Sequence, residues 1–185
     1  MNAPAPVAKR MTTTEFLAWA DTQDQGKFEL FEGEIIAMAP ERVGHAQSKA
    51  NAWRALADAI KVAGLPCQAF VDGLGVKISD DTTYVPDALV NCGPPLPTDV
   101  MLAANPVVVV EVLSTATRHI DKSTKLADYF TIPSLHHYLI IDLNKRHVFH
   151  HQRQPDGGVL VRVIKDGQIK LDPPGISIAV AELFE

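Results

Sequence analysis

The chain has 185 residues and a formal net charge of −5, with 46% hydrophobic and 21% charged residues. This length fits one domain with a substantial core, and the composition is ordinary for a globular protein. No apolar run approaches the roughly 20 residues that a membrane-spanning helix needs, and the N-terminus has no apolar signal-peptide region. We therefore expect no membrane association and a cytoplasmic location. The acidic balance argues against binding of nucleic acid by bulk electrostatic attraction.

Cysteine and histidine residues show no pattern that is typical of a zinc site. The two cysteines, Cys67 and Cys92, are far apart and lie outside any C-x-x-C motif, so we predict free buried thiols rather than a disulfide. A zinc site needs three or four ligands with supporting geometry. We instead expect exposed histidines on strands or at their ends, namely His136, His137, His147, His150 and His151.

The N-terminal region predicts a flexible tail over residues 1–11 and a single domain over residues 12–185. Thr12 and Glu15 have the spacing of a capping box, which indicates that a short helix begins here. This helix is the first element of the predicted domain.

Residues 27–38 predict a β-hairpin that turns at Glu32-Gly33. Glu29 alternates with Phe28 and Leu30, so its side chain is expected either on the surface or in a cleft, and the residues alone favour the surface.

Residues 45–63 give the clearest helical pattern, and Gly64 is its expected C-cap. Trp53 and Leu56 lie on the apolar face and are predicted core residues. His45 at the start of this helix is either a capping or exposed residue, or it faces the site and contacts phosphate or metal.

The second half of the chain predicts most of the sheet. Residues 121–131 predict a helix between two apolar strands, which favours a parallel crossover connection. A hairpin follows, and short strands with a turn of helix end the chain. The predicted strands cover residues 67–71, 76–79, 84–91, 106–114, 137–142, 147–152 and 159–165.

Two acidic residues interrupt this apolar pattern. Glu111 follows four consecutive valines, and a carboxylate in such a buried strand needs a partner, a metal or a raised pKa. Asp87 follows Pro86 at the start of another apolar strand and is its natural partner, although a lone Asp after Pro is also a common turn residue. Two acids on neighbouring strands, with Lys125 on the next element, can hold a divalent metal against a phosphate. The same lysine could instead pair with Asp121 one helical turn away.

Several short motifs occur in an order and spacing that resemble those of the Uma-type restriction endonuclease family. This family belongs to the PD-(D/E)XK nuclease superfamily. The resemblance covers roughly residues 12 to 185. The motifs are Phe28-Glu29-Leu30-Phe31-Glu32-Gly33-Glu34-Ile35, Met38-Ala39-Pro40 with His45, Pro86-Asp87, Glu111-Val112-Leu113-Ser114 with Thr117-Arg118, Asp121 and Lys125-Leu126, and Tyr138-Leu139-Ile140-Ile141-Asp142.

The resemblance implies an α/β (α+β) fold in which a mixed, restriction-endonuclease-like β-sheet is flanked by helices, with additional β-hairpins. It also implies a metal-dependent endonuclease that hydrolyses DNA, and relatives of this kind often act as homodimers. Mg²⁺ or Mn²⁺ would be bound by Asp87, Glu111 and the Val112 carbonyl. Lys125 would be the basic catalytic residue and Glu29 an additional acid.

The chain departs from the superfamily pattern at Leu113, because the motif has a lysine two residues after the second acid. Lys125 on the following helix is the expected replacement and Lys122 the weaker candidate. Basic residues near the site are candidates for contact with substrate, namely His45, Arg118 and Lys122. The acidic charge and Leu113 also leave two alternatives open: a non-catalytic binding or assembly module of the same fold, and a hydrolase of small phosphate esters.

Overall fold

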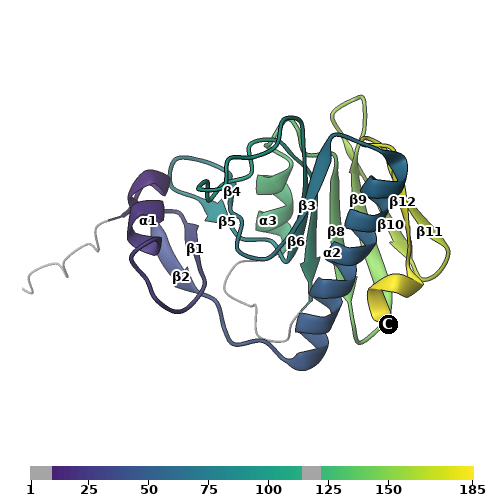
Figure 1. The fold of residues 1–185 in the computed structure, drawn as a ribbon, viewed down its shortest axis with the longest axis horizontal. Helices are drawn as coiled ribbons and strands as arrows, with labels where there is room; N and C mark the ends of the chain where they lie inside the picture. The colour runs from purple at the N-terminus through teal and green to yellow at the C-terminus, as the bar shows by residue number, and fades with distance from the viewer. Residues whose placement is uncertain (1–9, 114–121) are drawn as a thin grey trace, which may run out of the picture.

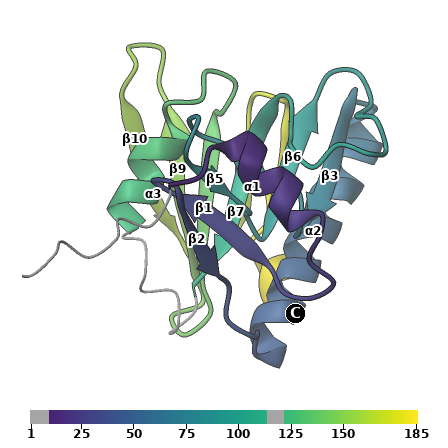
Figure 2. The same ribbon diagram turned by 90° about the vertical axis from the view of Figure 1, so that its left-hand side faces the viewer.

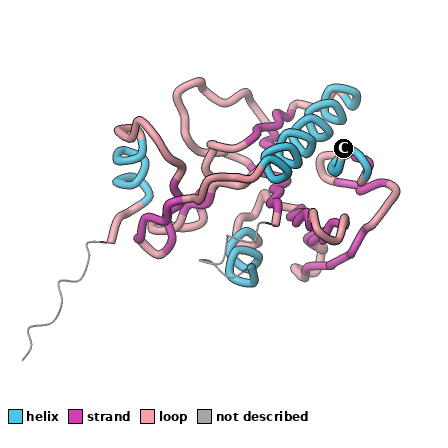
Figure 3. The backbone as a smooth tube through the Cα atoms, turned by 90° about the horizontal axis from the view of Figure 1, so that it is seen from below, coloured by secondary structure: helices cyan, strands magenta, loops and turns pink. Residues whose placement is uncertain are grey.

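The computed structural model describes residues 10–113 and 122–185, so the predicted flexible tail falls mainly outside the described residues. A six-stranded sheet forms the centre of the molecule, with the long helix α2 on one face and α3 on the other (Figures 1 and 3). The helices within these ranges are α1 (Thr13–Ala20), α2 (Val43–Ala63), α3 (Lys122–Tyr129) and the 3-10 helix η1 (Ala181–Phe184).

The large sheet is mixed, as predicted. Its order is β10-β9-β8-β7-β6-β3, in which β7 and β8 are parallel and every other neighbouring pair is antiparallel. The parallel pair flanks α3 in the sequence, so the predicted strand–helix–strand crossover is confirmed. Its strands are β3 (Cys67–Val71), β6 (Ala88–Cys92), β7 (Pro106–Val112), β8 (His137–Asp142), β9 (His147–Arg153) and β10 (Val159–Ile164).

Two smaller sheets complete the fold. A four-stranded sheet of order β2-β1-β5-β4 lies with α1 at one end of the molecule (Figure 1), which faces the viewer in Figure 2, and β11 pairs with β12 beside α2. These strands are β1 (Phe28–Phe31), β2 (Glu34–Ala37), β4 (Val76–Lys77), β5 (Thr83–Tyr84), β11 (Gln168–Leu171) and β12 (Ile176–Ala179). None of the described helices combines the length and apolarity to cross a bilayer.

Local sequence signals set the boundaries of several elements. Thr12 and Glu15 form the predicted capping box of α1. Glu32 and Gly33 adopt φ of 47° and 79° between β1 and β2, which is the backbone of a tight hairpin turn and suits a glycine. Gly64 ends α2 in the left-handed conformation. The predicted hairpin and helix C-cap are confirmed.

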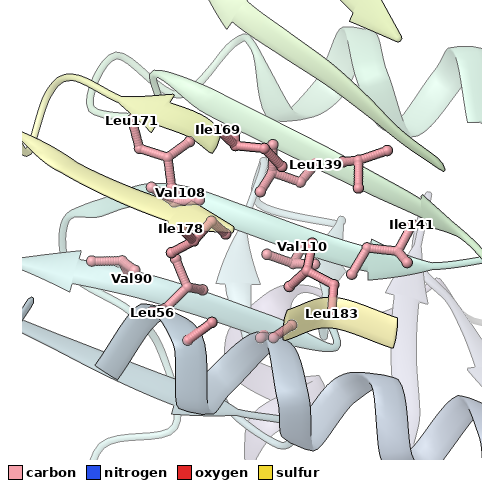
Figure 4. Packing of buried hydrophobic residues seen from close by; sticks show 14 of the residues in the cluster. Leu56, Val90, Val108, Val110, Leu139, Ile141, Ile169, Leu171, Ile178 and Leu183 are labelled. Atoms are coloured by element: carbon pink, nitrogen blue, oxygen red, sulfur yellow. The ribbon is translucent and has the colours of Figure 1, made fainter. Parts of the chain in front are cut away.

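The main core lies between α2, the large sheet and the β11–β12 hairpin (Figure 4). Leu56 of α2 is fully buried there, whereas Trp53 is 39% exposed and its Nε1 donates to the Ala69 carbonyl at 3.1 Å. The prediction that Trp53 is a core residue is wrong, because its ring lies beside the edge strand β3 rather than over the sheet. Figure 4 labels ten buried residues of this core, namely Leu56, Val90, Val108, Val110, Leu139, Ile141, Ile169, Leu171, Ile178 and Leu183.

The predicted strand over residues 84–91 divides between two sheets. β5 belongs to the small sheet and β6 to the large one, and Val85, Pro86 and Asp87 connect them. Pro86 has no N–H for a ladder, which explains why pairing stops here. The break places Asp87 where the two sheets meet.

Cys67 and Cys92 form a disulfide, so the prediction of free thiols is wrong. They lie directly opposite each other in the β3–β6 register, a long-range pairing that their spacing in the sequence does not reveal. Disulfides are rare in a reducing cytoplasm. The expected cytoplasmic location therefore also favoured free thiols over this bond.

Replacing both cysteines, as Cys67→Ser with Cys92→Ser, should lower the free energy of unfolding by about 3 kcal/mol, because the bond closes a loop of intermediate length in the unfolded chain. Urea unfolding with and without reductant measures this. Reductant should bring the wild type to the stability of the double variant and leave that variant unchanged. Two titratable thiols in the non-reduced, denatured wild type would contradict the disulfide.

Candidate active site

Glu111 lies near the end of β7, in which side chains alternate between the two faces of the sheet. Val110 and Val112 join the core beneath α2, whereas Val109 belongs to the cluster beside α3. Glu111 shares the side of Val109, and its Oε1 accepts a hydrogen bond from the Tyr129 hydroxyl of α3 at 3.0 Å. The valine run therefore carries a carboxylate onto the face covered by α3.

Asp87 lies at the end of the β6–β7 ladder and is 3% exposed. The pairing of the two strands ends at Ala88 and Val110. Beyond this pair the Val112 N–H donates to Asp87 Oδ2 at 2.6 Å. The Asp87 carboxylate thus takes the place of a missing strand partner, which fixes one of its oxygens beside the backbone of Val112.

Lys125 reaches the site from α3 and bridges acids of two other elements. Its Nζ lies 2.9 Å from Glu29 Oε1 of β1 and 3.1 Å from Glu111 Oε1 of β7. Glu29 also accepts the Val85 N–H at 3.0 Å and is 5% exposed. The expectation of a surface position for Glu29 is wrong, because the small sheet turns this side of the hairpin toward α3.

Burial and like charges change the pKa values of these groups. Burial raises the pKa of Glu29, although the Lys125 ammonium opposes the shift. Burial and the Glu111 charge raise the pKa of Asp87 to about 6, against the opposing hydrogen bond from Val112. Burial alone would lower the pKa of Lys125, but the charges of Glu111 and Glu29 outweigh it and raise that pKa. Lys125 is therefore an ammonium at neutral pH and serves as a hydrogen-bond donor.

His45 in the first turn of α2 faces Val112 and Asp87. Its Nε2 lies 3.0 Å from the Val112 carbonyl oxygen and 3.6 Å from Asp87 Oδ2. A carbonyl oxygen only accepts, so Nε2 carries the hydrogen in this arrangement. Nδ1 is buried, has no hydrogen-bond partner among the described residues, and lies 3.5 Å from Glu41 Oε2. Among the described residues, one group of three has ligand atoms within 4.8 Å of one another and could hold a metal ion: Glu41, His45 and Asp87.

Lys49, one turn further along α2, is buried among three carboxylates. Its Nζ lies 2.6 Å from Glu41 Oε1, 2.9 Å from Asp72 Oδ2 and 3.2 Å from Asp87 Oδ1. Lys27 also pairs with Asp72. Burial alone would raise the pKa of Glu41, but the hydrogen bond and charge of Lys49 outweigh it and lower that pKa.

The groups around Asp87 fit a divalent cation. Carboxylate and carbonyl oxygens suit Mg²⁺ and Mn²⁺, and an imidazole nitrogen favours Mn²⁺ over Mg²⁺. When all are ionised, five carboxylates meet three ammonium groups in the described part of the site, so one divalent ion would balance the excess. The carboxylates are Glu29, Glu41, Asp72, Asp87 and Glu111, and the ammonium groups are Lys27, Lys49 and Lys125.

Sequence reasoning named Asp87, Glu111, Val112, Lys125, Glu29 and His45, and the structure brings these residues together. Arg118 and the side chain of Lys122 lie outside the described residues. The prediction missed Glu41, Lys49 and Asp72. Lys49 offered a signal, since it lies on the apolar stripe of α2 with Ala52 and Leu56, where a charge needs a partner.

The histidines of β8 and β9 are buried, so the expectation that they are exposed is wrong. His137 Nδ1 lies 2.9 Å from His150 Nε2, and burial lowers the pKa of each of these two residues to about 4. Side chains project from the faces of a sheet, and other groups cover these faces: the backbone of Asp172 and Pro173 lies against His137, and the His151 ring stacks on Tyr138. Exposed fractions of 0 to 7% are found for His137, His147, His150 and His151.

Comparison with known proteins assigns the sequence to a family. Residues 13–181 match the sequence model of Uma2, described as "Putative restriction endonuclease". The chain belongs to the Uma2 family. The uncharacterized protein sll1609 of Synechocystis sp. is 33% identical over 151 residues, which cover 80% of this chain and 84% of that protein. The uncharacterized protein slr1290 of the same organism is 25% identical over 185 residues, covering 99% and 96% of the two chains.

A solved structure shares the fold. The crystal structure of a protein from Anabaena variabilis, described as a putative nuclease belonging to DUF820, aligns with a TM-score of 0.71. The alignment covers 94% of this chain and 97% of that chain at 18% sequence identity. The predicted α+β fold with a nuclease-like mixed sheet is therefore confirmed.

The pKa of Asp87 predicts how stability depends on pH. Its value in the folded protein, about 6, exceeds the ordinary 3.8, so ionisation of Asp87 destabilises the fold. The stabilising effect of the neutral carboxyl is lost as the pH rises from about 4 through 6. We expect the metal-free Asp87→Asn variant to gain about 3 kcal/mol relative to the wild type over this interval.

Urea unfolding at several pH values in the presence of a chelator measures that difference. Asp80→Asn is the matched control, because Asp80 is exposed and its pKa is lowered by Lys77. This control should show no such gain. A difference between Asp87→Asn and wild type that is constant with pH would contradict the proposed burial of the Asp87 charge.

Proposed function

We propose that this Uma2 protein is a metal-dependent endonuclease that hydrolyses phosphodiester bonds of DNA. The observation that carries the proposal is the convergence of Asp87, Glu111 and Lys125 beside the Val112 carbonyl. These residues come from the β5–β6 connection, β7 and α3, and hydrogen bonds or ion pairs fix each of them. Family membership supports the nuclease reading.

Asp87, Glu111 and the Val112 carbonyl oxygen would hold Mg²⁺ or Mn²⁺. Within the described part of the chain, Glu111 Oε2 has no partner, while Oε1 is held by Lys125 and Tyr129. The bound ion would polarise the scissile phosphate and lower the pKa of a coordinated water. His45 would donate from Nε2–H to the phosphate or, in the other tautomer, add Nε2 as a nitrogen ligand, because Nε2 lies beside Val112 and Asp87.

Lys125 would stabilise the negative charge that builds up on the phosphate oxygens. Its raised pKa keeps it protonated, so we assign it no role as a general base. Glu29 would orient Lys125, since its Oε1 lies 2.9 Å from Nζ and its position is fixed by the Val85 N–H.

The substrate would approach through basic residues at the margin of the site, for which His45, Arg118 and Lys122 are the candidates. The net charge of −5 makes general attraction to DNA weak, so local contacts must position the phosphate. We further propose a homodimer, because two sites suit cleavage of both strands of a duplex. We also propose one domain over residues 12–185, because β1, α2, β7 and α3 all contribute to one site.

Cleavage of supercoiled plasmid in Mn²⁺ or Mg²⁺ tests the proposal. Glu111→Gln and Lys125→Met should each lower the cleavage rate at least about 100-fold, while Lys61→Ala, an exposed lysine of α2, should retain activity. A chelator should abolish cleavage. Cleavage that survives the chelator or Glu111→Gln would contradict the assignment, and single-stranded DNA and RNA substrates would show whether duplex DNA is preferred.

A second candidate is a non-catalytic binding module. The pairing of Asp87 with Lys49, and of Glu29 and Glu111 with Lys125, favours it, because these acids already have cationic partners. Glu111→Ala would take a partner from both Lys125 and Tyr129, so this variant should have a lower free energy of unfolding whichever function is correct. Absence of both metal binding and plasmid cleavage in the folded wild type would favour this alternative.

A further inference from the structure

Lys49 is enclosed in a carboxylate cage, by which we mean Glu41, Asp72 and Asp87 around its Nζ. The three nitrogen–oxygen distances are 2.6, 2.9 and 3.2 Å, and the Lys49 side chain is 3% exposed. The cage oxygens come from the loop before α2, the end of β3 and the β5–β6 connection. A convergence of three carboxylate oxygens on one point is the arrangement that a hard cation takes in proteins.

Two of the cage carboxylates, those of Glu41 and Asp87, have one oxygen toward Lys49 and the other toward His45. Glu41 and Asp87 direct Oε1 and Oδ1 to Lys49. Their other oxygens, Oε2 and Oδ2, lie 3.5 and 3.6 Å from the ring nitrogens of His45. The side that faces His45 is the candidate metal group, whereas the opposite side already holds an ammonium.

We propose that the Lys49 ammonium is a fixed monovalent cation in a second cation position next to Asp87, so that the protein binds one exchangeable divalent ion per chain. The inference rests on the proposed function, because it takes the exchangeable ion to bind at Asp87. Lys49 then acts as a positioning residue: it holds Asp87 Oδ1, so that Oδ2, on the side of Val112 and His45, is left for the metal.

Charge supports a single exchangeable ion. With Lys49 in place, the described carboxylates of the site exceed the described ammonium groups by two when all are ionised, which one divalent ion neutralises. A second divalent ion in the same low-dielectric region would carry uncompensated positive charge. Removal of the Lys49 ammonium would open the cage and raise the excess of negative charge, so that a second ion could bind.

Calorimetric titration of Mn²⁺ into the full-length protein measures the stoichiometry without reference to activity. We expect one ion per chain for the wild type and two for Lys49→Ala. Lys49→Ala combined with Asp72→Asn removes one cage carboxylate but leaves Glu41, His45 and Asp87, so it should return to one ion. Lys61→Ala, an exposed lysine on the same helix, should bind one ion as the wild type does.

The outcomes separate this inference from the proposed function. Two ions bound to the wild type, or one ion bound to folded Lys49→Ala, would overturn the one-ion inference and leave the metal site at Asp87 intact. No binding to the wild type would remove that site and both proposals with it. If Lys49→Ala is unfolded without metal, Mn²⁺ should restore its circular dichroism spectrum, and failure of Mn²⁺ to do so would overturn the inference.

Discussion

Several buried carboxylates lie close together in this structure, and the structure depends on the groups that compensate their negative charge. Burial raises the pKa of Asp87, and the charge of the nearby Glu111 raises it further. Such a cluster is unfavourable unless cations and hydrogen-bond donors compensate. Lys49 and Lys125 provide two of the cations from opposite sides of the sheet, one on α2 and one on α3. The helices therefore have an electrostatic role in addition to covering the core.

The position of the carboxylate cluster follows from the interruption of strand pairing between β5 and β6. Pairing of β6 with β7 stops at Ala88, and the small sheet begins on the other side of the connection that contains Asp87. Glu29 from that sheet, Glu111 from the large sheet and Lys125 from α3 meet at this junction. The site exists only when both sheets and both flanking helices are in place, so its geometry is a property of the whole tertiary structure.

Local signals in the sequence predicted the elements that local physics determines. The Glu32-Gly33 hairpin turn, the Gly64 helix end and the carboxylate within the valine run of β7 were all recognisable. The cage around Lys49 was not, because Glu41, Asp72 and Asp87 come together only through packing of α2 across the sheet. The Cys67–Cys92 bond likewise depends on strand register. Long-range pairing, rather than composition or periodicity, decided both features.

The most direct test of the central claim is a crystal structure of the protein grown with Mn²⁺, with an anomalous difference map recorded for manganese. We predict a single strong peak within coordination distance of Asp87, Glu111 and the Val112 carbonyl, with Lys49 still between Glu41 and Asp72. Such a peak would locate the metal at the junction of the two sheets. A map without a peak there, or with its only peak elsewhere on the molecule, would contradict the account.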